Sequence, residues 1–444
     1  MTLISLPVLL YVIPAVMLIA ALVPPRRKPA ALGIGGVVFE TVTGGVFGLT
    51  LLMLSVCSAW LMLRLMPAEE TARQRRIRLG CGIGIQAAVL IAGKLLLTPE
   101  TLLPILLCAM LGIECMQARA QQRMHIPPLI AYLGAACAMP HFWAGPVMAF
   151  GAMREMTEKR EASAENIGSG ARLCVRGLFQ MALLSLPMTA LLREIGSFVP
   201  LLTAADAWLT LLVFYCSVYY GLRGAVQFGS GLALMLGYRH PAETVYPIRA
   251  ASSEEFWRTA FSSAAAWTDR VLLQNGSGNP GGIFLRLLPV FGSVGVLLGN
   301  GWCGLIWGVW QAAVLTLGRL PAVSERLRPL PKPVRRCGTA LLMLLGSGLL
   351  MHGSLAAMFA HSGALLGVNG TALSDTVRYL CGEHFLSLLL CIVLLFPIVP
   401  WLETKLRGIA RIRKAAAFCV PLAELGILLC CMAELLSQYL RAAQ

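Results

Sequence analysis

The sequence predicts an all-α fold: a polytopic membrane helical bundle of about 10–12 transmembrane helices, with additional interfacial or re-entrant helices. Three observations carry this prediction. Apolar residues make up 57% of the 444 residues and charged residues only 13%, whereas a soluble domain carries about 25% charged residues. The mean hydropathy is +0.75. Apolar runs of about 20 residues, the length that crosses a bilayer, recur along the chain.

Thirteen apolar runs are candidate spans, and some of them are short, broken or re-entrant. They are residues 4–23, 30–44, 46–66, 79–97, 101–117, 127–150, 176–196, 200–222, 283–299, 301–320, 338–360, 376–400 and 415–437. The first run is longer than the apolar part of a signal peptide and no Ala-x-Ala-type site follows it, so we expect it to be a span. Strands are not expected, because a helix satisfies its own backbone hydrogen bonds in lipid.

Two regions are too polar to be simple spans. Residues 152–172 carry eight charged side chains, which predicts a solvated or interfacial helix. Residues 239–282 mix charged residues with Trp and Phe, and this composition is typical of an interfacial or re-entrant helix that packs against the bundle.

The net charge of +15 does not indicate nucleic-acid binding. The basic residues lie in short clusters between apolar runs, as the positive-inside bias of membrane proteins predicts, and not on one face or tail. The 14 cysteines contain no Cys-x-x-Cys pair and no Cys/His spacing of a zinc site, so no metal site is expected. Most of them stand in apolar runs, where a thiol acts as a small apolar side chain.

Three separated motifs are informative as an ordered set. The first runs from Pro140 to Val147 and reads PHFWAGPV. The second lies between Gly224 and Trp267 and contains the run Glu255-Phe256-Trp257-Arg258. The third is Gly301-Trp302-Cys303-Gly304, followed by Trp307-Gly308 and Gln311. Their order and spacing, over roughly residues 80–360, resemble the bacterial membrane-bound O-acyltransferases, particularly the alginate O-acetyltransferase branch.

This resemblance implies one membrane-embedded domain over residues 1–444, with the family-like core at about 80–360. It implies transfer of an acyl group, acetyl, to hydroxyls of an envelope or extracellular polysaccharide. The donor would be an acyl thioester, with no bound cofactor. The implied surroundings are the lipid bilayer of the bacterial inner membrane, the polysaccharide acceptor, and periplasmic or membrane partner acyltransferase proteins.

The sequence departs from the family pattern at its polar centre. The catalytic histidine of the family's Trp-His-Gly motif corresponds to Cys303, and a second family histidine corresponds to Phe261. The aspartate of the family's Ser-Gly-Tyr-Ser-Asp motif corresponds to Gln227, and its Arg-Asp pair is reversed to Asp269-Arg270.

Acyl transfer to a hydroxyl needs a proton acceptor and a group that stabilises the developing oxyanion. A buried thiol does not replace a histidine in this role, so Cys303 is either a nucleophile that holds the acyl group as a thioester or a small packing residue. The other candidate residues that line the site are His141, Trp302, Gln227, Glu255, Trp257, Arg258, Phe261 and Lys94. Packing is the alternative role for the aromatic residues, and snorkelling is the alternative for Lys94.

Two functional hypotheses follow from these residues. The first is an active acyltransferase of polysaccharides. The second is a catalytically inactive relative that serves as a scaffold or conduit in a polysaccharide modification or export complex. The joint departure from the family pattern at Cys303, Phe261, Gln227 and Ala260 favours it. A secondary transporter is disfavoured, because the chain shows no inverted repeat of broken helices.

Overall fold

Regular secondary structure in the computed structural model is helical throughout the part of the chain that it describes, which comprises residues 6–24, 27–67, 71–144, 163–196, 201–237, 246–273, 279–406 and 410–443. Within these ranges, nine helices are long and apolar enough to cross a membrane, and a bent helix pair gives a tenth if it counts as one span. Large apolar side chains on these helices are exposed, for example Leu95 at 80% and Phe418 at 76%, as lipid contact requires. The predicted polytopic helical bundle is confirmed, and the protein is an integral, multi-pass membrane protein.

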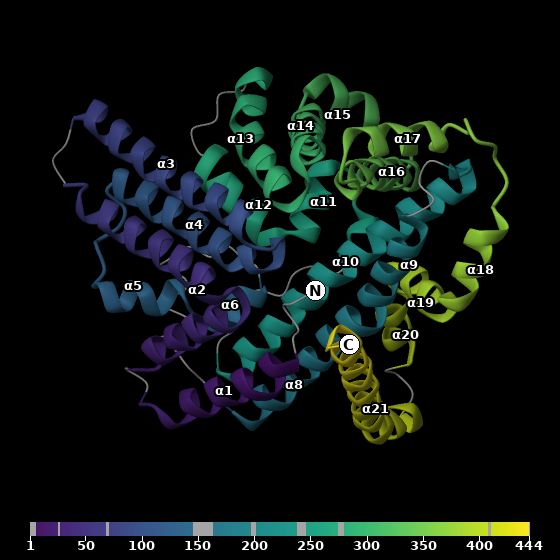
Figure 1. Cartoon of the computed structure of the whole chain (residues 1–444), viewed down its shortest axis with the longest axis horizontal. Helices are drawn as coiled ribbons and strands as arrows, with labels where there is room; N and C mark the ends of the chain where they lie inside the picture. Colours follow the sequence, from purple (N-terminus) through teal and green to yellow (C-terminus); the bar gives the residue numbers. More distant parts are fainter. Residues whose placement is uncertain are drawn as a thin grey trace.

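The N-terminal block contains a helix that is sharply bent. The elements of this block are η2 (Val8–Val12), α1 (Ile13–Leu22), α2 (Lys28–Arg64), α3 (Ala72–Leu96), α4 (Pro99–Ala120), α5 (Leu129–Ala136) and α6 (Met139–Ala144). In α2, Gly45 has a φ of 62° and a ψ of −157°, a conformation that the missing Cβ permits. Figure 1 shows the two arms of α2 leaving this bend in different directions beside α4. The two predicted spans 30–44 and 46–66 are these two arms.

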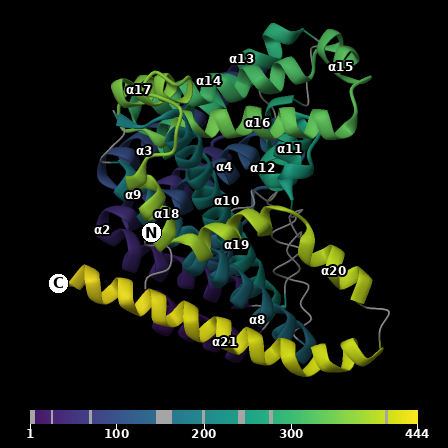
Figure 2. The ribbon, with the colours of Figure 1, turned by 90° about the vertical axis from the view of Figure 1, so that its right-hand side faces the viewer.

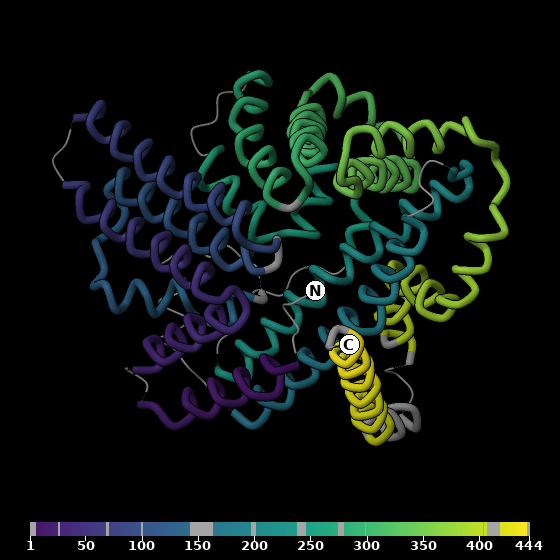
Figure 3. Tube along the Cα trace, in the orientation of Figure 1, coloured from purple at the N-terminus to yellow at the C-terminus, as the bar shows by residue number. Residues whose placement is uncertain are grey.

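The central helix α10 joins the two halves of the molecule. The elements here are α8 (Ala164–Leu178), η4 (Phe179–Ser185), α9 (Leu186–Gly196) and α10 (Ala204–Met235). Helix α10 packs against α6 and α8 on one side and against α16 and α17 further along. The trace in Figure 3 shows it passing between the N-terminal block and the C-terminal helices.

A glycine seam lets α8 and α10 approach closely. Gly170 lies opposite Gly231, and Gly177 lies opposite Gly224, so the two helices run antiparallel with glycines two turns apart on each. A Cβ on Gly177 would lie 2.6 Å from the carbonyl oxygen of Gly224 and 2.6 Å from the amide nitrogen of Phe228. Such small-residue contacts replace the hydrophobic effect as a source of helix association in lipid.

The third block covers one end of α10. Its elements are η6 (Pro247–Arg249), α11 (Ser253–Ala260), α12 (Ser262–Thr268), η7 (Asp269–Leu273), α13 (Pro280–Leu298), α14 (Gly301–Gly318), α15 (Pro321–Leu327) and α16 (Lys332–Met351). Helices α13 and α14 form a tight hairpin, in which a Cβ on Gly304 would collide with the carbonyl oxygen of Gly295. The glycine of the third motif is therefore needed for the close approach of two helices.

The last block begins at α17 (Leu355–Leu365) and ends at a long helix on the outside of the molecule. The remaining elements are α18 (Asp375–Glu383), α19 (Phe385–Leu395), α20 (Ile398–Leu406) and α21 (Ala410–Ala443). Helices α18 and α19 meet at 81°, so the predicted span 376–400 is broken. Figure 2 shows α21 across the lower side of the molecule, opposite the layer of α13, α14 and α16.

The structure differs from the prediction in one of the two polar regions, residues 152–172, and contains short helices in the other, residues 239–282. Residues 152–162 of the predicted interfacial helix lie outside the described residues, and the remainder begins α8, which continues through η4 and α9 to Gly196. The prediction of a separate helix ending at 172 is therefore wrong at its C-terminal end, because the helix continues without a break into the next span. The region 239–282 contains the short helices α11 and α12, neither of which is long enough to span the bilayer.

Candidate functional site

A chamber of about 1050 Å³ lies where α10 meets the third block. Most of its walls come from α4, α8, η4, α10, α11, α12, α13, α14 and α16, with single residues or pairs from η6, η7, α19, α20 and α21. Most of the lining side chains are apolar. A cavity of this size, with few polar groups, is the usual form of a small-molecule site. Since the second and third motifs both contribute to its walls, it is the candidate functional site.

An aromatic group forms one wall of the chamber. The ring of Trp257 lies 5.0 Å from that of Phe261, 5.1 Å from that of Phe291 and 6.3 Å from that of Trp307. The indole Nε1 of Trp257 donates a hydrogen bond to Oε1 of Gln311 at 3.2 Å. This bond uses the amide oxygen, so the Gln311 Nε2 group keeps its two N–H donors for other partners.

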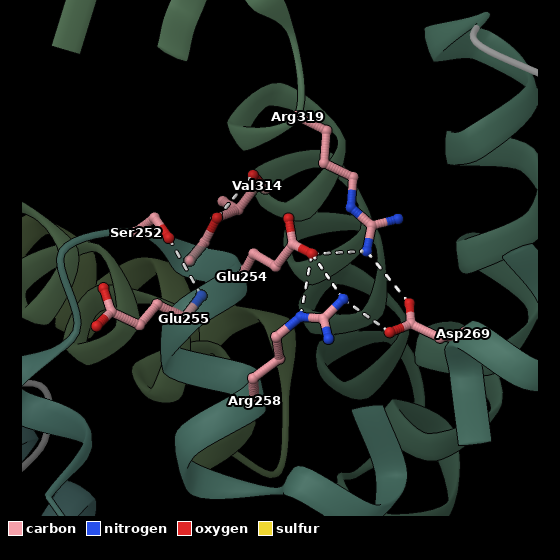
Figure 4. A network of polar contacts seen from close by, with 8 residues as sticks. Ser252, Glu254, Glu255, Arg258, Asp269, Val314 and Arg319 are labelled. Atoms are coloured by element: carbon pink, nitrogen blue, oxygen red, sulfur yellow. Dashed lines mark hydrogen bonds and ion pairs between the residues drawn. The ribbon is translucent and has the colours of Figure 1, made fainter. Parts of the chain in front are cut away.

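Four charged side chains form a network at the chamber wall, shown in Figure 4. Arg258 on α11 donates to Glu254 Oε1 at 3.0 Å and to Asp269 Oδ2 at 2.8 Å. Arg319, which follows α14, donates to the same Glu254 oxygen at 3.3 Å and to Asp269 Oδ1 at 3.5 Å. Two guanidiniums and two carboxylates balance one another, so the network fixes α11, η7 and the end of α14 without leaving net charge.

The network makes the stability of this wall depend on pH. Burial alone would raise the pKa of Glu254, but the Arg319 and Arg258 guanidiniums outweigh it and hold the pKa below the ordinary value of 4.5. A carboxyl with a lowered folded-state pKa stabilises the fold fully above its unfolded pKa, and this contribution is lost as the pH falls through the folded pKa. We expect the melting temperature of the wild type to exceed that of Glu254→Gln at pH 7. The difference should shrink on acidification below about pH 4.5, measured by thermal unfolding of the purified protein. A difference that is independent of pH would contradict this account.

Helix α4 is tied to α12 and η7, which line part of the chamber, through three contacts on one face. Trp267 Nε1 donates to the Met110 carbonyl at 3.0 Å, and Gln117 Nε2 donates to the Val271 carbonyl at 2.7 Å. Between these contacts, Arg270 forms a two-point ion pair with Glu114, with distances of 2.9 and 3.2 Å. The Glu114 side chain is only 11% exposed, so this pair is largely shielded from water.

The structure brings four of the predicted residues together around the chamber and places five elsewhere. The four that line it are Gln227, Trp257, Arg258 and Phe261. Those outside its lining are His141, Trp302, Cys303, Glu255 and Lys94. Gln227 accepts a hydrogen bond from Gln180 Nε2 at 2.7 Å.

Cys303 lies in the first turn of α14 and is 1% exposed. It stands one helical turn before Trp307, which lines the chamber, but it is not part of the lining itself. No described histidine or carboxylate forms a hydrogen bond with its thiol. This position fits a small side chain packed in the α13–α14 hairpin.

The other four residues outside the lining lie in different surroundings. Glu255 accepts a hydrogen bond from the Ala251 amide at 2.7 Å, next to the first turn of α11. His141 is buried in α6, which packs on α2 and α10, and Trp302 is 68% exposed. The C-terminal part of the first motif, from Gly145 to Val147, lies outside the described residues.

Lys94 joins the N-terminal block to the hairpin that carries the third motif. Its Nζ donates to the carbonyls of Leu297 at 3.0 Å and Gly299 at 2.7 Å. These carbonyls belong to the C-terminal end of α13, where a cation also complements the helix dipole. The side chain therefore holds the α13–α14 turn and does not reach the chamber.

The sequence reasoning missed Glu254, Arg319 and Arg223, all of which line the chamber. The spacing of Glu254 and Arg258, four residues apart on a helix, was a usable signal for the first of them. Arg319 and Arg223 carried no signal of this kind, because their roles depend on helices that are distant in sequence. Among the described residues, no group of three or more His, Cys, Asp or Glu side chains is placed to hold a metal ion.

The comparisons with known proteins agree with the motifs. The chain is 27% identical over 223 residues to the probable alginate O-acetylase AlgI of Pseudomonas aeruginosa, which covers 49% of this chain and 42% of the relative. It is 26% identical over 210 residues to the protein of the same name from Azotobacter vinelandii, covering 46% of this chain and 42% of that relative. A peptidoglycan O-acetyltransferase of Helicobacter pylori is 24% identical over 194 residues, covering 42% of this chain and 37% of its own length.

These matches span less than half the length of each relative. No family model matches the chain. The predicted resemblance to the membrane-bound O-acyltransferases, particularly their alginate branch, is confirmed by these relatives.

Proposed function

We propose that this protein transfers an acyl group, acetyl, from a thioester donor to a hydroxyl of an envelope or extracellular polysaccharide at the bacterial inner membrane. The observation that carries this proposal is the chamber: one large, mainly apolar cavity whose wall combines residues of the second and third motifs. The names of the relatives, which are O-acetylases of alginate and of peptidoglycan, support the choice of reaction.

All the bonds that form and break in this reaction belong to the two substrates. The hydroxyl oxygen attacks the thioester carbonyl carbon, an ester bond forms, the carbon–sulfur bond breaks, and the hydroxyl proton leaves with the thiolate as a thiol. An apolar chamber that excludes water favours this transfer over hydrolysis of the donor.

Gln311 is the proposed donor to the developing oxyanion. Trp257 occupies its amide oxygen and thereby fixes the orientation of the carboxamide, which leaves the N–H donors for the chamber. A fixed donor of this kind stabilises negative charge that develops during the reaction, since it needs no reorganisation.

Cys303 remains the residue that the resemblance assigns to the catalytic position. Its burial and its place outside the lining support a packing role over an acyl-carrying one. We further propose, on the resemblance alone, that a periplasmic or membrane partner acyltransferase protein completes the transfer to the polysaccharide.

The test measures O-acetyl content of surface polysaccharide in a strain from which the gene is deleted. The wild type should restore acetylation, and Cys303→Ala should restore it equally. Ser347→Trp, which fills the chamber from α16, should reduce it at least about tenfold, and Gln311→Leu should reduce the rate about 100-fold.

Cys337→Trp is the matched control for the filled chamber, because Cys337 is exposed on the same helix. Failure of the wild type to restore acetylation would argue against the function itself. Full restoration by Ser347→Trp would exclude the chamber as the site, and loss with Cys303→Ala would establish a catalytic thiol.

A further inference from the structure

Arg223 places a guanidinium in the chamber wall between two tyrosine rings. It belongs to α10 and lines the chamber. Its Cζ lies 5.7 Å from the ring centre of Tyr219 and 5.4 Å from that of Tyr246, and its Nη1 donates to the Tyr219 hydroxyl at 3.2 Å. All of these partners are neutral groups.

Arg223 differs in this respect from the other arginines of the chamber. Arg176 lies 3.9 Å from a Glu424 oxygen, and Arg258 and Arg319 share the carboxylates of the network. Among the described lining residues, Arg223 is therefore the arginine that lacks a carboxylate. Its Nε is buried and makes no hydrogen bond to any described group.

An uncompensated cation in an apolar chamber is unfavourable. Removing a charge from water without a counter-ion is costly, and a cation–π contact at a partly exposed site offsets only a small part of that cost. Gln227, one turn further along α10, faces the same chamber but is neutral. The described part of the wall therefore lacks an anion that would balance Arg223.

We propose that Arg223 binds an oxyanion, a carboxylate or a phosphate, carried by the ligand of the chamber. A guanidinium presents parallel N–H donors that match either group in a two-point contact. The inference rests on the proposed function for the identity of that ligand: the phosphate belongs to the thioester donor, and the carboxylate belongs to a uronate residue of the acceptor.

Binding to purified protein in lipid nanodiscs tests this proposal without requiring acetyl transfer. Acetyl coenzyme A supplies the phosphate-bearing probe, a mannuronate oligosaccharide the carboxylate-bearing one, and an N-acetylglucosamine oligosaccharide the neutral one. We expect one anionic probe to bind the wild type, and Arg223→Gln to weaken that binding at least tenfold. The neutral probe should be unaffected by the substitution.

A second variant uses the neighbouring glutamine. Gln227→Asp should supply an internal counter-ion one turn away, compete with the ligand and weaken binding of the anionic probe, while Arg223 is intact. Arg326→Gln, in α15 and outside the chamber, is the matched control for loss of one positive charge and should bind as the wild type does. In the empty protein, Arg223→Gln should raise the melting temperature, because it removes the unbalanced charge.

The inference fails if Arg223→Gln binds both anionic probes as the wild type does, or if neither anionic probe binds the wild type. Binding that depends on Arg223, in a protein that does not restore acetylation, would uphold the inference and contradict the proposed function. Restored acetylation, together with binding that does not depend on Arg223, would support the proposed function and contradict the inference.

Discussion

Gly177→Leu is expected to remove folded protein from the membrane. A Cβ at this position would lie 2.6 Å from two backbone atoms of α10, and a leucine adds three more carbon atoms to the same contact. Since backbone cannot move aside as a flexible side chain does, the two helices must separate along the seam. We expect destabilisation of at least about 3 kcal/mol, beyond the usual cost of one added methylene.

The measurement is the yield and melting temperature of protein purified from membranes. Gly168→Leu is the matched control, because it stands on the same helix and a Cβ there has no neighbour within 4 Å. This control should be neutral or slightly stabilising, since glycine is a poor helix former. Equal stability of the two variants would show that close packing along the α8–α10 seam is not needed for stable folding.

Arg270→Leu is expected to have the second largest effect. It leaves the Glu114 carboxylate, whose side chain is 11% exposed, without the guanidinium that binds both of its oxygens. Removing one partner of a buried ion pair costs about 3–5 kcal/mol, and we expect the lower end because the arginine side chain is 35% exposed. The part of the chamber wall formed by α12 and η7 should loosen with it, so the acetylation that we propose should fall as well.

The double variant Glu114→Leu/Arg270→Leu distinguishes loss of the pair from loss of a single charge. Replacing both partners of a buried pair with apolar residues is often close to neutral, so the double variant should recover much of the stability lost in Arg270→Leu. Thermal unfolding of the four proteins completes a double-mutant cycle. A double variant that is as unstable as the sum of the two single variants would show no coupling between these side chains.

Span length and composition predicted the helical bundle well, because the bilayer imposes both. They did not predict how helices continue or bend. The polar start of α8 reads as a separate surface helix, yet its backbone continues into the next span through Ser185. The bend at Gly45 was easier to predict, because only this residue separates the predicted spans 30–44 and 46–66.

The candidate site was predicted less completely than the fold. Trp257 and Arg258 stand in a recognisable run, and the structure places both at the chamber. Cys303 was singled out because the family has a histidine there, but motif position does not specify which way a helix turns its side chains. Arg223 and Arg319 face the chamber because of the way in which α10 and α14 pack in the bundle. This packing cannot be read from the local sequence of either helix.

The neighbouring charges Asp269 and Arg270 serve two different partners. Asp269 faces Arg258 and Arg319, while Arg270 faces Glu114 on α4. The order of the two residues is therefore tied to three other positions, of which the farthest, Glu114, lies 156 residues away in sequence. A variant with the reversed order, Asp269→Arg/Arg270→Asp, would set arginine against two arginines and aspartate against glutamate. Exchange of segments with another protein is thus constrained by charge order, so α4, α11 and the end of α14 must be exchanged together with this dipeptide.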